Sequence, residues 1–211
     1  MRRILITSGP TREYLDPVRF LTNASSGRMG AALAQAVLNQ GDLPVIVSGS
    51  VEITYPDSAE IHWTETTEEM LQCCVELFPQ CSGVIGAAAP CDFMPVMFSP
   101  QKLQKPADGS GITVAFRETP DILATLGQMK RQDQWSIGFA LETAGVQNGG
   151  KEHALEKLQK KNCRLIVLNT PDSISKSRST FQVFDAAGTL RLNFTGTKAA
   201  LAEKLLSMSG K

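Results

Sequence analysis

The hydrophobic positions of this chain fall into short apolar runs separated by longer mixed stretches. The apolar runs predict buried strands at residues 4–6, 43–49, 60–63, 83–89, 112–116, 136–141 and 165–168. Stretches of good helix formers, several of them amphipathic, predict helices at residues 31–40, 66–78, 122–130, 151–161 and 197–206. Two later runs, at 180–184 and 190–194, flank turn residues and predict a β-hairpin. This alternation predicts one α/β domain over residues 1–211, with a mostly parallel sheet, helices on both faces and a late β-hairpin.

Proline and glycine mark where these elements end. Gly41 stands where a C-cap glycine would follow the first helix, and Pro120 stands near the first position of the helix at 122–130. Residues 90–111 contain four prolines and show no clear periodicity. A loop of that length inside a compact domain is usually functional or disordered, and we expect an active-site flap here.

Charge and cysteine content exclude several classes of protein. Lys plus Arg and Asp plus Glu both number 21, so the net charge is zero and indicates no general attraction to nucleic acid or an anionic membrane. The five cysteines form no C-x-x-C pair, and neither an apolar signal segment nor a run of about 18 apolar residues occurs. With only His62 and His153, a His-rich metal site is not expected. We therefore expect a reduced, cytoplasmic protein that binds neither nucleic acid nor membrane.

The stretch at residues 4–30 combines a strand, a polar loop and a helix start. After a proline-broken segment, the chain reads NASSGRMG at residues 23–30 and then enters the first helix. Unpaired N–H groups at a helix start and the helix dipole favour phosphate there, and Gly27 and Gly30 permit close backbone approach. Ser-Ser-Gly is equally ordinary capping and turn chemistry, so these residues alone leave nucleotide binding and a plain turn both open.

The longer string at residues 7–30 is more specific. It reads TSGPTREYLDPVRFLTNASSGRMG and closely resembles the opening of the phosphopantothenoylcysteine synthetase family, whose members usually form the C-terminal half of a fused bacterial protein of coenzyme A biosynthesis. The resemblance implies a Rossmann-like three-layer fold. It also implies that Asn23 handles an activated acyl-nucleotide intermediate and that Ser25, Ser26 and Gly27 hold phosphate. An Asn in a turn before a helix is more commonly a local cap, and that interpretation stays open.

A second segment, GAAAPCDF, is similar to the family's Ala-Ala-Val-Ala-Asp-Tyr motif. Pro90 and Cys91 replace Val and Ala, and Phe93 replaces Tyr. The resemblance makes Ala88 and Asp92 candidate nucleotide contacts. The Asp92 carboxylate would accept hydrogen bonds from a base amino group or a ribose hydroxyl, or else serve only as a loop N-cap.

A third group of motifs lies between residues 119 and 162. It resembles the family's Asn-Pro-Asp-Ile, Gly-Phe-Ala-x-Glu-Thr and Lys-x-x-x-Lys-Asn patterns. The nucleotide contacts implied by this resemblance are Pro120, Asp121, Ile122, Leu123, Phe139, Lys157 and Lys161. The two lysines stand four apart, so they share one helix face and could meet one phosphate chain. The alternative is a solvated basic face, with Phe139 in the core.

The segment SPQKLQK at residues 99–105 resembles the family's Lys-x-Lys-Lys flap. Lys102 and Lys105 match the first and last lysines, and Gln104 replaces one between them. The resemblance implies that Lys102 is catalytic, because a flap lysine can neutralise the charge that develops as pyrophosphate leaves. Two isolated lysines in a proline-rich loop are otherwise a solvated surface.

The reaction implied by the resemblance is a ligation in two steps. The carboxylate of 4′-phosphopantothenate attacks the α-phosphorus of CTP, releasing pyrophosphate and giving an acyl-cytidylate, and the amine of cysteine then displaces CMP. Mg²⁺ normally accompanies the triphosphate, with ligands that the sequence leaves unassigned. CTP is expected rather than ATP, and a homodimer is expected, with the hairpin at 180–194 as a contributor. A flavin-dependent decarboxylase half is not present, so we expect that activity from a separate chain.

The sequence lacks the motifs of two other classes of nucleotide-binding protein. A short-chain NAD(P)-dependent oxidoreductase also opens with strand, glycine loop and helix, but neither Tyr14 nor Tyr55 is followed by lysine four residues later, and G-x-G-x-x-G does not occur. The phosphate-loop motif G-x-x-x-x-G-K-[ST] is also missing, which excludes that class of nucleotide hydrolase. A non-catalytic nucleotide-binding relative stays open because of Pro90, Cys91 and Gln104.

Overall fold

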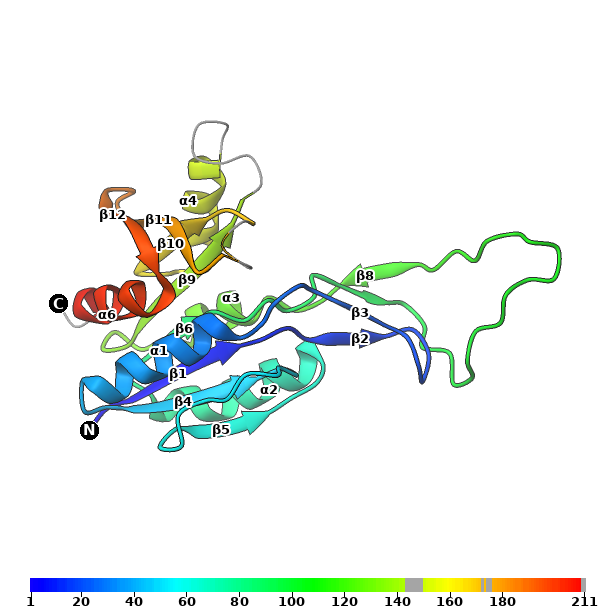
Figure 1. The fold of residues 1–211 in the computed structure, drawn as a ribbon, viewed down its shortest axis with the longest axis horizontal. Coiled ribbons are helices and arrows are strands. Elements are labelled where there is room, and N and C mark those ends of the chain that lie inside the picture. The colour runs from blue at the N-terminus through cyan, green and yellow to red at the C-terminus, as the bar shows by residue number, and fades with distance from the viewer. Residues whose placement is uncertain (143–149, 172, 174–175, 210–211) are drawn as a thin grey trace.

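A computed structural model gives the fold and describes residues 1–142, 150–171, 173 and 176–209. Its centre is an eight-stranded sheet in the order β12-β11-β10-β9-β6-β1-β4-β5 (Figure 1). The strands are β1 (Arg3–Ser8), β4 (Leu43–Ser48), β5 (Glu60–Trp63), β6 (Gly83–Gly86), β9 (Trp135–Leu141), β10 (Leu165–Asn169), β11 (Arg178–Asp185) and β12 (Leu190–Thr197). The pairs from β5 through β10 are parallel, and β11 and β12 add an antiparallel edge.

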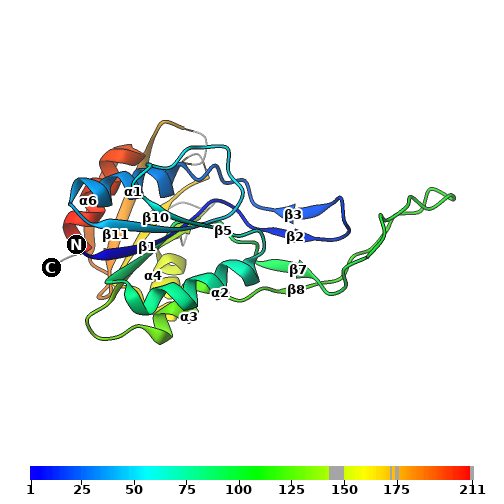
Figure 2. The same cartoon turned by 90° about the horizontal axis from the view of Figure 1, so that it is seen from below.

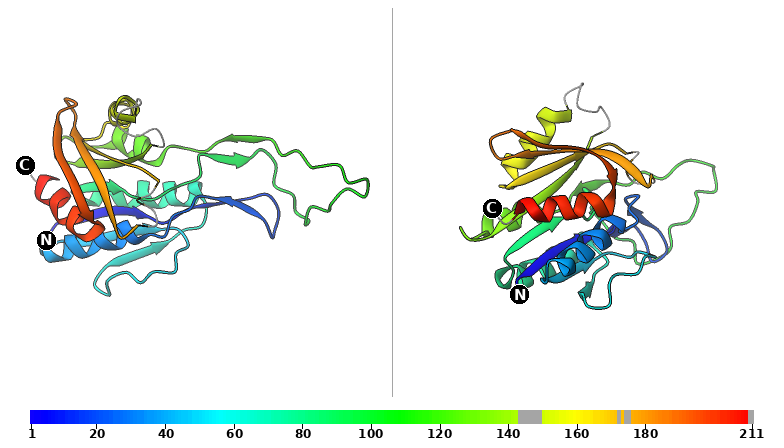
Figure 3. Two further views of the ribbon diagram at one scale, coloured as in Figure 1. Left: turned by 45° about the horizontal axis from the view of Figure 1, so that its top comes forward. Right: turned by 60° about the vertical axis from the view of Figure 1, so that its left-hand side comes forward.

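Helices cover both faces of this sheet, as predicted. They are α1 (Arg28–Asn39), α2 (Thr67–Leu77), α3 (Ile122–Met129), α4 (Gly150–Lys160) and α6 (Lys198–Ser209), with a 3₁₀ turn η1 (Phe78–Gln80) after α2. Side chains alternate across β1, so Ile4 and Ile6 pack with α1 and α6 on one face, whereas Leu5 packs with α2, α3 and α4 on the other. Figures 2 and 3 show the resulting three layers. The Rossmann-like three-layer fold and the late hairpin are confirmed.

Local signals placed most helix ends correctly. Thr66 forms a capping box with Glu69 at the start of α2, and the predicted cap glycine, Gly41, has a positive φ of 77° just after α1. Asp121 is the N-cap of α3, because its carboxylate accepts a hydrogen bond from Ala124 N at 3.1 Å, and Pro120 stands directly before this cap. The predicted loop at 145–150 lies mostly outside the described residues.

Two small hairpins form an extended arm that the sequence did not predict. They are β2 (Arg12–Tyr14) with β3 (Phe20–Thr22), and β7 (Phe93–Pro95) with β8 (Phe116–Glu118). Together with the long loop between β7 and β8, they project away from the carboxyl edge of the sheet (Figures 1 and 2). The predicted strand at 112–116 is wrong, since only Phe116 of that run lies in a strand, and this strand pairs with β7 outside the main sheet. The predicted strand at 83–89 likewise ends at Gly86.

Candidate functional site

The strand order reverses direction between β1 and β6, because the chain proceeds from β1 to β4 and β5 on one side and from β6 to β9 and β10 on the other. Ligands of open α/β sheets bind outside the carboxyl ends of the strands at such a point. Two adjoining cavities, of about 450 and 500 Å³, open there. They share the lining residues Ala88, Pro90, Asp92, Phe139 and Lys161.

The larger cavity meets the N-terminus of α1. Ser25, Ser26 and Gly27 line it, together with Arg28. Gly27 is the N-cap of α1, has a φ of 73° and provides no side-chain cap, so the N–H groups of the first turn have no capping side chain. A Cβ on Gly27 would stand 2.8 Å from Cγ1 of Val51, which favours glycine here. This geometry suits an anionic ligand at the helix start.

Gly30 has a different role from the one its motif indicates. Its backbone faces strand β1, where an added Cβ would lie 2.0 Å from Oγ of Ser8. Ser8 Oγ in turn donates to the carbonyl oxygen of Gly27 at 3.3 Å. Gly30 therefore permits α1 to approach β1 closely, which places the helix N-terminus at the cavity without itself contacting it.

Asn23 joins the loop before α1 to the loop after β6 by hydrogen bonds. Its side-chain Nδ2 donates to the carbonyl oxygen of Pro90 at 2.8 Å and lies 3.4 Å from that of Ala89. Asn23 also lines the larger cavity. The Asn23 side chain is therefore not a local cap of α1, because it bonds a loop distant in the sequence.

The smaller cavity is lined by the segment that leads into α3 and by the loop after β6. Pro120, Asp121, Ile122 and Leu123 contribute to it, with Glu118 and Thr119 from the end of the arm. Thr119 Oγ1 donates to the carbonyl oxygen of Cys91 at 2.5 Å, and Cys91 N donates to Thr11 Oγ1 at 2.8 Å. Burial raises the pKa of the Cys91 thiol, so this departure from the family motif supplies a packed loop residue rather than a thiolate nucleophile.

Lys157 and Lys161 both reach the cavities, and each has a carboxylate partner. Lys157 Nζ lies 2.6 Å from Oε1 of Glu142, and Lys161 Nζ lies 3.2 Å from Oδ2 of Asp121. An anion that enters would therefore compete with Glu142 and Asp121 for these ammonium groups. Asn162, with a positive φ of 48°, donates from Nδ2 to the Gly127 carbonyl and fixes the turn that follows Lys161.

Sequence reasoning missed two cations of the larger cavity, Arg28 and Lys198. Lys198 Nζ donates to the Ser173 carbonyl oxygen at 2.6 Å. Burial, and then the charge of Arg28, lower the pKa of Lys198, because both disfavour a second cation there. Lys198 begins α6, and nothing in its local sequence shows that β11 and β12 return it to α1.

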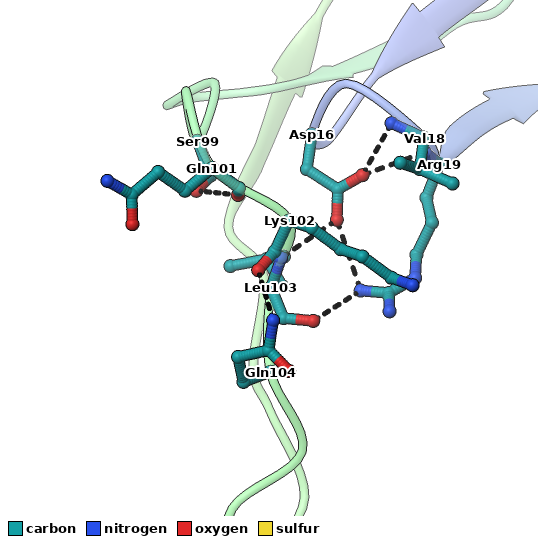
Figure 4. Close-up of polar contacts among 8 residues, drawn as sticks. All are labelled: Asp16, Val18, Arg19, Ser99, Gln101, Lys102, Leu103 and Gln104. Carbon is teal, nitrogen blue, oxygen red and sulfur yellow. Dashed lines mark hydrogen bonds and ion pairs between the residues drawn. The ribbon is translucent and has the colours of Figure 1, made fainter.

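Lys102 and Lys105 are not among the described residues that line either cavity. They lie in the loop of the arm, where hydrogen bonds from the β2–β3 turn hold the backbone beside Lys102 (Figure 4). The other candidates named from the sequence all line one or both cavities. Those residues are Asn23, Ser25, Ser26, Gly27, Ala88, Asp92, Pro120, Asp121, Ile122, Leu123, Phe139, Lys157 and Lys161.

Comparison with known proteins identifies the family. The family model described as "DNA/pantothenate metabolism flavoprotein C-terminal domain" matches residues 1–209. The chain belongs to this family. It is similar to the crystal structure of the C-terminal domain of the coenzyme A biosynthesis bifunctional protein CoaBC, with a TM-score of 0.81 and 34% identity over 98% of this chain and 93% of that one. The resemblance to the phosphopantothenoylcysteine synthetases is thereby confirmed.

Full-length relatives are longer proteins. The match to the CoaBC protein of Vibrio parahaemolyticus is 37% identical over 168 residues and covers 80% of this chain and 41% of that protein. The match to a "Cysteine/Cysteine sulfinic acid decarboxylase" from an unidentified prokaryote is 42% identical over 172 residues and covers 80% of this chain and 46% of that protein. The matched regions thus cover less than half the length of these relatives.

The described part of the chain also bears on metal binding and on membrane insertion. No group of three or more His, Cys, Asp or Glu side chains is arranged there to hold a metal ion. No helix among the described residues is long and apolar enough to cross a membrane.

Proposed function

We propose that this chain is a phosphopantothenate–cysteine ligase. The observation that carries the proposal is the convergence of the phosphate-type helix N-terminus of α1, Asp92 and several basic side chains on two cavities that share Phe139 and Lys161. Membership of a family that includes the C-terminal part of CoaBC supports the same activity. The decarboxylase name of one relative belongs to a protein more than twice as long as the matched region, and we do not carry it over.

The proposed reaction begins with activation of the carboxylate. The carboxylate of 4′-phosphopantothenate attacks the α-phosphorus of the nucleotide, and pyrophosphate leaves with its bonding electron pair. The first-turn amides of α1, with Arg28 and Lys198, would stabilise the phosphate oxygens. The amine of cysteine then attacks the acyl carbon of the acyl-nucleotide, the amide forms and the nucleoside monophosphate leaves. Positioning and charge stabilisation account for most of such catalysis, so no Ser-His-Asp arrangement is required.

Asn23 has a defined place in this scheme. Its amide is tied to Pro90, and its loop leads directly to Ser25 and the start of α1. We propose that it orients the acyl-nucleotide for the second step. This role predicts that removing the amide leaves the first step intact.

The nucleotide and metal are further parts of the proposal. We propose CTP as the nucleotide, with its base in the smaller cavity against the segment from Pro120 to Leu123. Mg²⁺ prefers oxygen ligands, and it is commonly held by one or two carboxylates together with substrate phosphates. The Asp92 carboxylate, which lines both cavities, fits such a donor set and would supply a protein ligand while Mg²⁺ neutralises charge on the phosphates.

We also propose that the active form is a homodimer. The arm carries exposed apolar side chains at Phe93, Met97 and Phe98, with exposed fractions of 51%, 82% and 54%. Exposed apolar side chains gathered on a projecting element are typical of a surface that another chain covers. The cytoplasmic location and the separate decarboxylase chain stay predictions.

Pyrophosphate release tests the proposal most directly. The purified chain is incubated with Mg²⁺, 4′-phosphopantothenate and either CTP or ATP, with and without cysteine. We expect CTP turnover and a cysteine amide that mass spectrometry detects. A folded protein that turns over neither nucleotide but still binds one would favour the non-catalytic relative, and an activity that needs NAD(P) would favour an oxidoreductase.

A further inference from the structure

Asp16 lies in the turn between β2 and β3 and has a fully covered side chain, with 0% exposure. One carboxylate oxygen, Oδ1, accepts hydrogen bonds from the backbone N–H groups of Val18 and Arg19, both at 2.8 Å. These two bonds are ordinary turn chemistry, in which an Asp side chain bonds the backbone two and three residues on. They shape the hairpin and would need nothing further.

The other carboxylate oxygen reaches a distant part of the chain. Asp16 Oδ2 accepts a hydrogen bond from Leu103 N at 3.1 Å, and from Arg19 Nη1 at 3.1 Å. The same Nη1 donates to the Leu103 carbonyl oxygen at 3.0 Å. Figure 4 shows the Asp16 carboxylate and the Arg19 guanidinium next to one another, with dashed lines from them to this backbone unit. Both polar groups of Leu103 are therefore bonded by the β2–β3 turn, and Leu103 directly follows Lys102.

Few other bonds hold this part of the arm. The ladder between β7 and β8 extends only as far as the bond from Val96 N to the Ala115 carbonyl. Beyond it, among the described residues, the loop is joined to the rest of the molecule by the bond from Ser99 N to the Leu15 carbonyl and by the contacts of Asp16 and Arg19. The remaining hydrogen bonds are local, such as that from Ser110 N to Asp108. The Asp16–Arg19 pair therefore supplies two of the three hydrogen bonds that join this part of the loop to the rest of the described chain.

The same hairpin connects this loop with the cavities. Strand β3 begins at Phe20, directly after Arg19, and ends at Thr22, directly before Asn23. The three residues of β3 separate Arg19 from Asn23, and the four steps of extended chain span about 13 Å. Thr22 Oγ1 also donates to the Thr11 carbonyl at 2.7 Å, which fixes the cavity end of the strand. The backbone at Lys102 is thus connected to Asn23 through one short strand.

We propose that Asp16, with Arg19, forms a clip on the backbone of Leu103 that positions Lys102 for the ligation reaction, which makes Asp16 a positioning residue. Only the positioning of Lys102 rests on the proposed function, since the clip itself is a property of the folded chain. The hydrogen bonds to the carboxylate also hold the pKa of Asp16 below its ordinary value against the opposing effect of burial, so the acceptor stays ionised at neutral pH.

Substitution of Asp16 by Asn should break the hydrogen bonds of the clip and keep those of the turn. The carbonyl oxygen of Asn can still accept from Val18 and Arg19, whereas its NH₂ group would face the donors on Leu103 and Arg19. Asp108→Asn is the matched control, because Asp108 lies in the same loop and its hydrogen bonds to other described residues are local, with Ser110. Both variants should unfold thermally close to the parent chain.

Trypsin provides a readout that does not depend on activity. It cleaves after lysine except before proline, so Lys105-Pro106 resists it and Lys102-Leu103 is the cleavable lysine bond of this segment. The N–H group that donates to Asp16 belongs to the Lys102-Leu103 peptide bond. The clip must therefore open before a protease can bind this peptide bond. Loss of a charge-assisted hydrogen bond should raise the open population and the cleavage rate about tenfold in Asp16→Asn. The Arg117-Glu118 bond and the Asp108→Asn variant should show no change.

Kinetics test the positioning role. Misplacement of a catalytic group by about 1 Å can cost up to about 100-fold in rate, so kcat for pyrophosphate release should fall by about tenfold to 100-fold in Asp16→Asn. In a Lys102→Ala background, the same substitution should cause little further loss, because the group being positioned is gone.

The outcomes are distinct. Unchanged cleavage at Lys102-Leu103 in Asp16→Asn would overturn the clip. An equal loss of kcat with and without Lys102 would overturn the positioning role, since Asp16 would then act on something else. Faster cleavage in a chain that never releases pyrophosphate would uphold the clip and overturn the proposed function.

Discussion

Gly30→Ala tests the close approach of α1 to β1, on which the position of the helix N-terminus depends. The added Cβ would lie 2.0 Å from Oγ and 2.5 Å from Cβ of Ser8, and neither distance is tolerated without movement. Ser8 cannot easily turn away, because its Oγ accepts from the Tyr55 hydroxyl at 2.8 Å and donates to the Gly27 carbonyl. The helix must therefore shift or these hydrogen bonds must break.

The expected magnitude combines opposing effects. Ala is the better helix former by about 1 kcal/mol, which favours the variant. Overpacking of a well-packed contact costs about 1–3 kcal/mol, and loss of one or two net hydrogen bonds adds about 1–2 kcal/mol. The sum predicts that the free energy of unfolding falls by about 1–4 kcal/mol.

Urea denaturation measures this change, with Ser8→Gly as the compensating substitution. Ser8→Gly alone should be destabilising, since it removes the hydrogen bonds and adds chain entropy. Gly30→Ala should then cost much less in the Ser8→Gly background than in the parent chain. A Gly30→Ala variant as stable as the parent, or an equal cost in both backgrounds, would refute the close-approach argument.

Three other predictions address the site and the pH dependence of folding. Asn23→Ala should still release pyrophosphate but fail to form the cysteine amide; normal product formation would remove Asn23 from the mechanism. Lys102→Ala should lower turnover far more than it lowers the unfolding temperature, and a chain that loses stability while it keeps its activity per folded molecule would make Lys102 structural. Burial raises the pKa of Asp42, but the hydrogen bonds and charge of Arg2 outweigh that effect and hold the pKa below its ordinary value. The Arg2–Asp42 pair therefore stabilises the fold above about pH 3.9, and this stabilisation is lost as the pH falls through the folded-state pKa. Asp42→Asn should therefore lower the free energy of unfolding by about 1 kcal/mol at neutral pH and weaken the loss of stability toward acid pH. An unchanged dependence of stability on acid pH would contradict this assignment.

The elements of the main sheet could be predicted because their sequences carry the required information locally. Runs such as residues 4–6 are apolar on both faces of the strand, which is the mark of a strand covered on both sides. The arm strands differ, since β3 and β8 are exposed along their whole length and pair only within small hairpins. Without a buried face, no periodicity marks them, and the apolar run at 112–116 was misleading because only its last residue lies in a strand.

The site could be predicted where one contiguous motif supplies it and not where the fold assembles it. Residues 23–27 reach the cavity as a unit, so their motif was sufficient. The pairing of Lys157 with Glu142 and of Lys161 with Asp121 joins separate elements, and sequence spacing gives no distance between them. Lys198 could not be predicted as a site residue, because only the fold shows that the final hairpin brings α6 alongside α1.

The packing of α6 against α1 affects how the protein folds during synthesis. Helix α6 packs against α1, and its first residue, Lys198, completes the cationic lining that Arg28 begins. During synthesis, the early strands and α1 leave the ribosome long before α6 is available to cover them. The apolar surface of α1 is then exposed to chaperones or to aggregation, and the anion-binding region stays incomplete until the chain has been translated almost to residue 209.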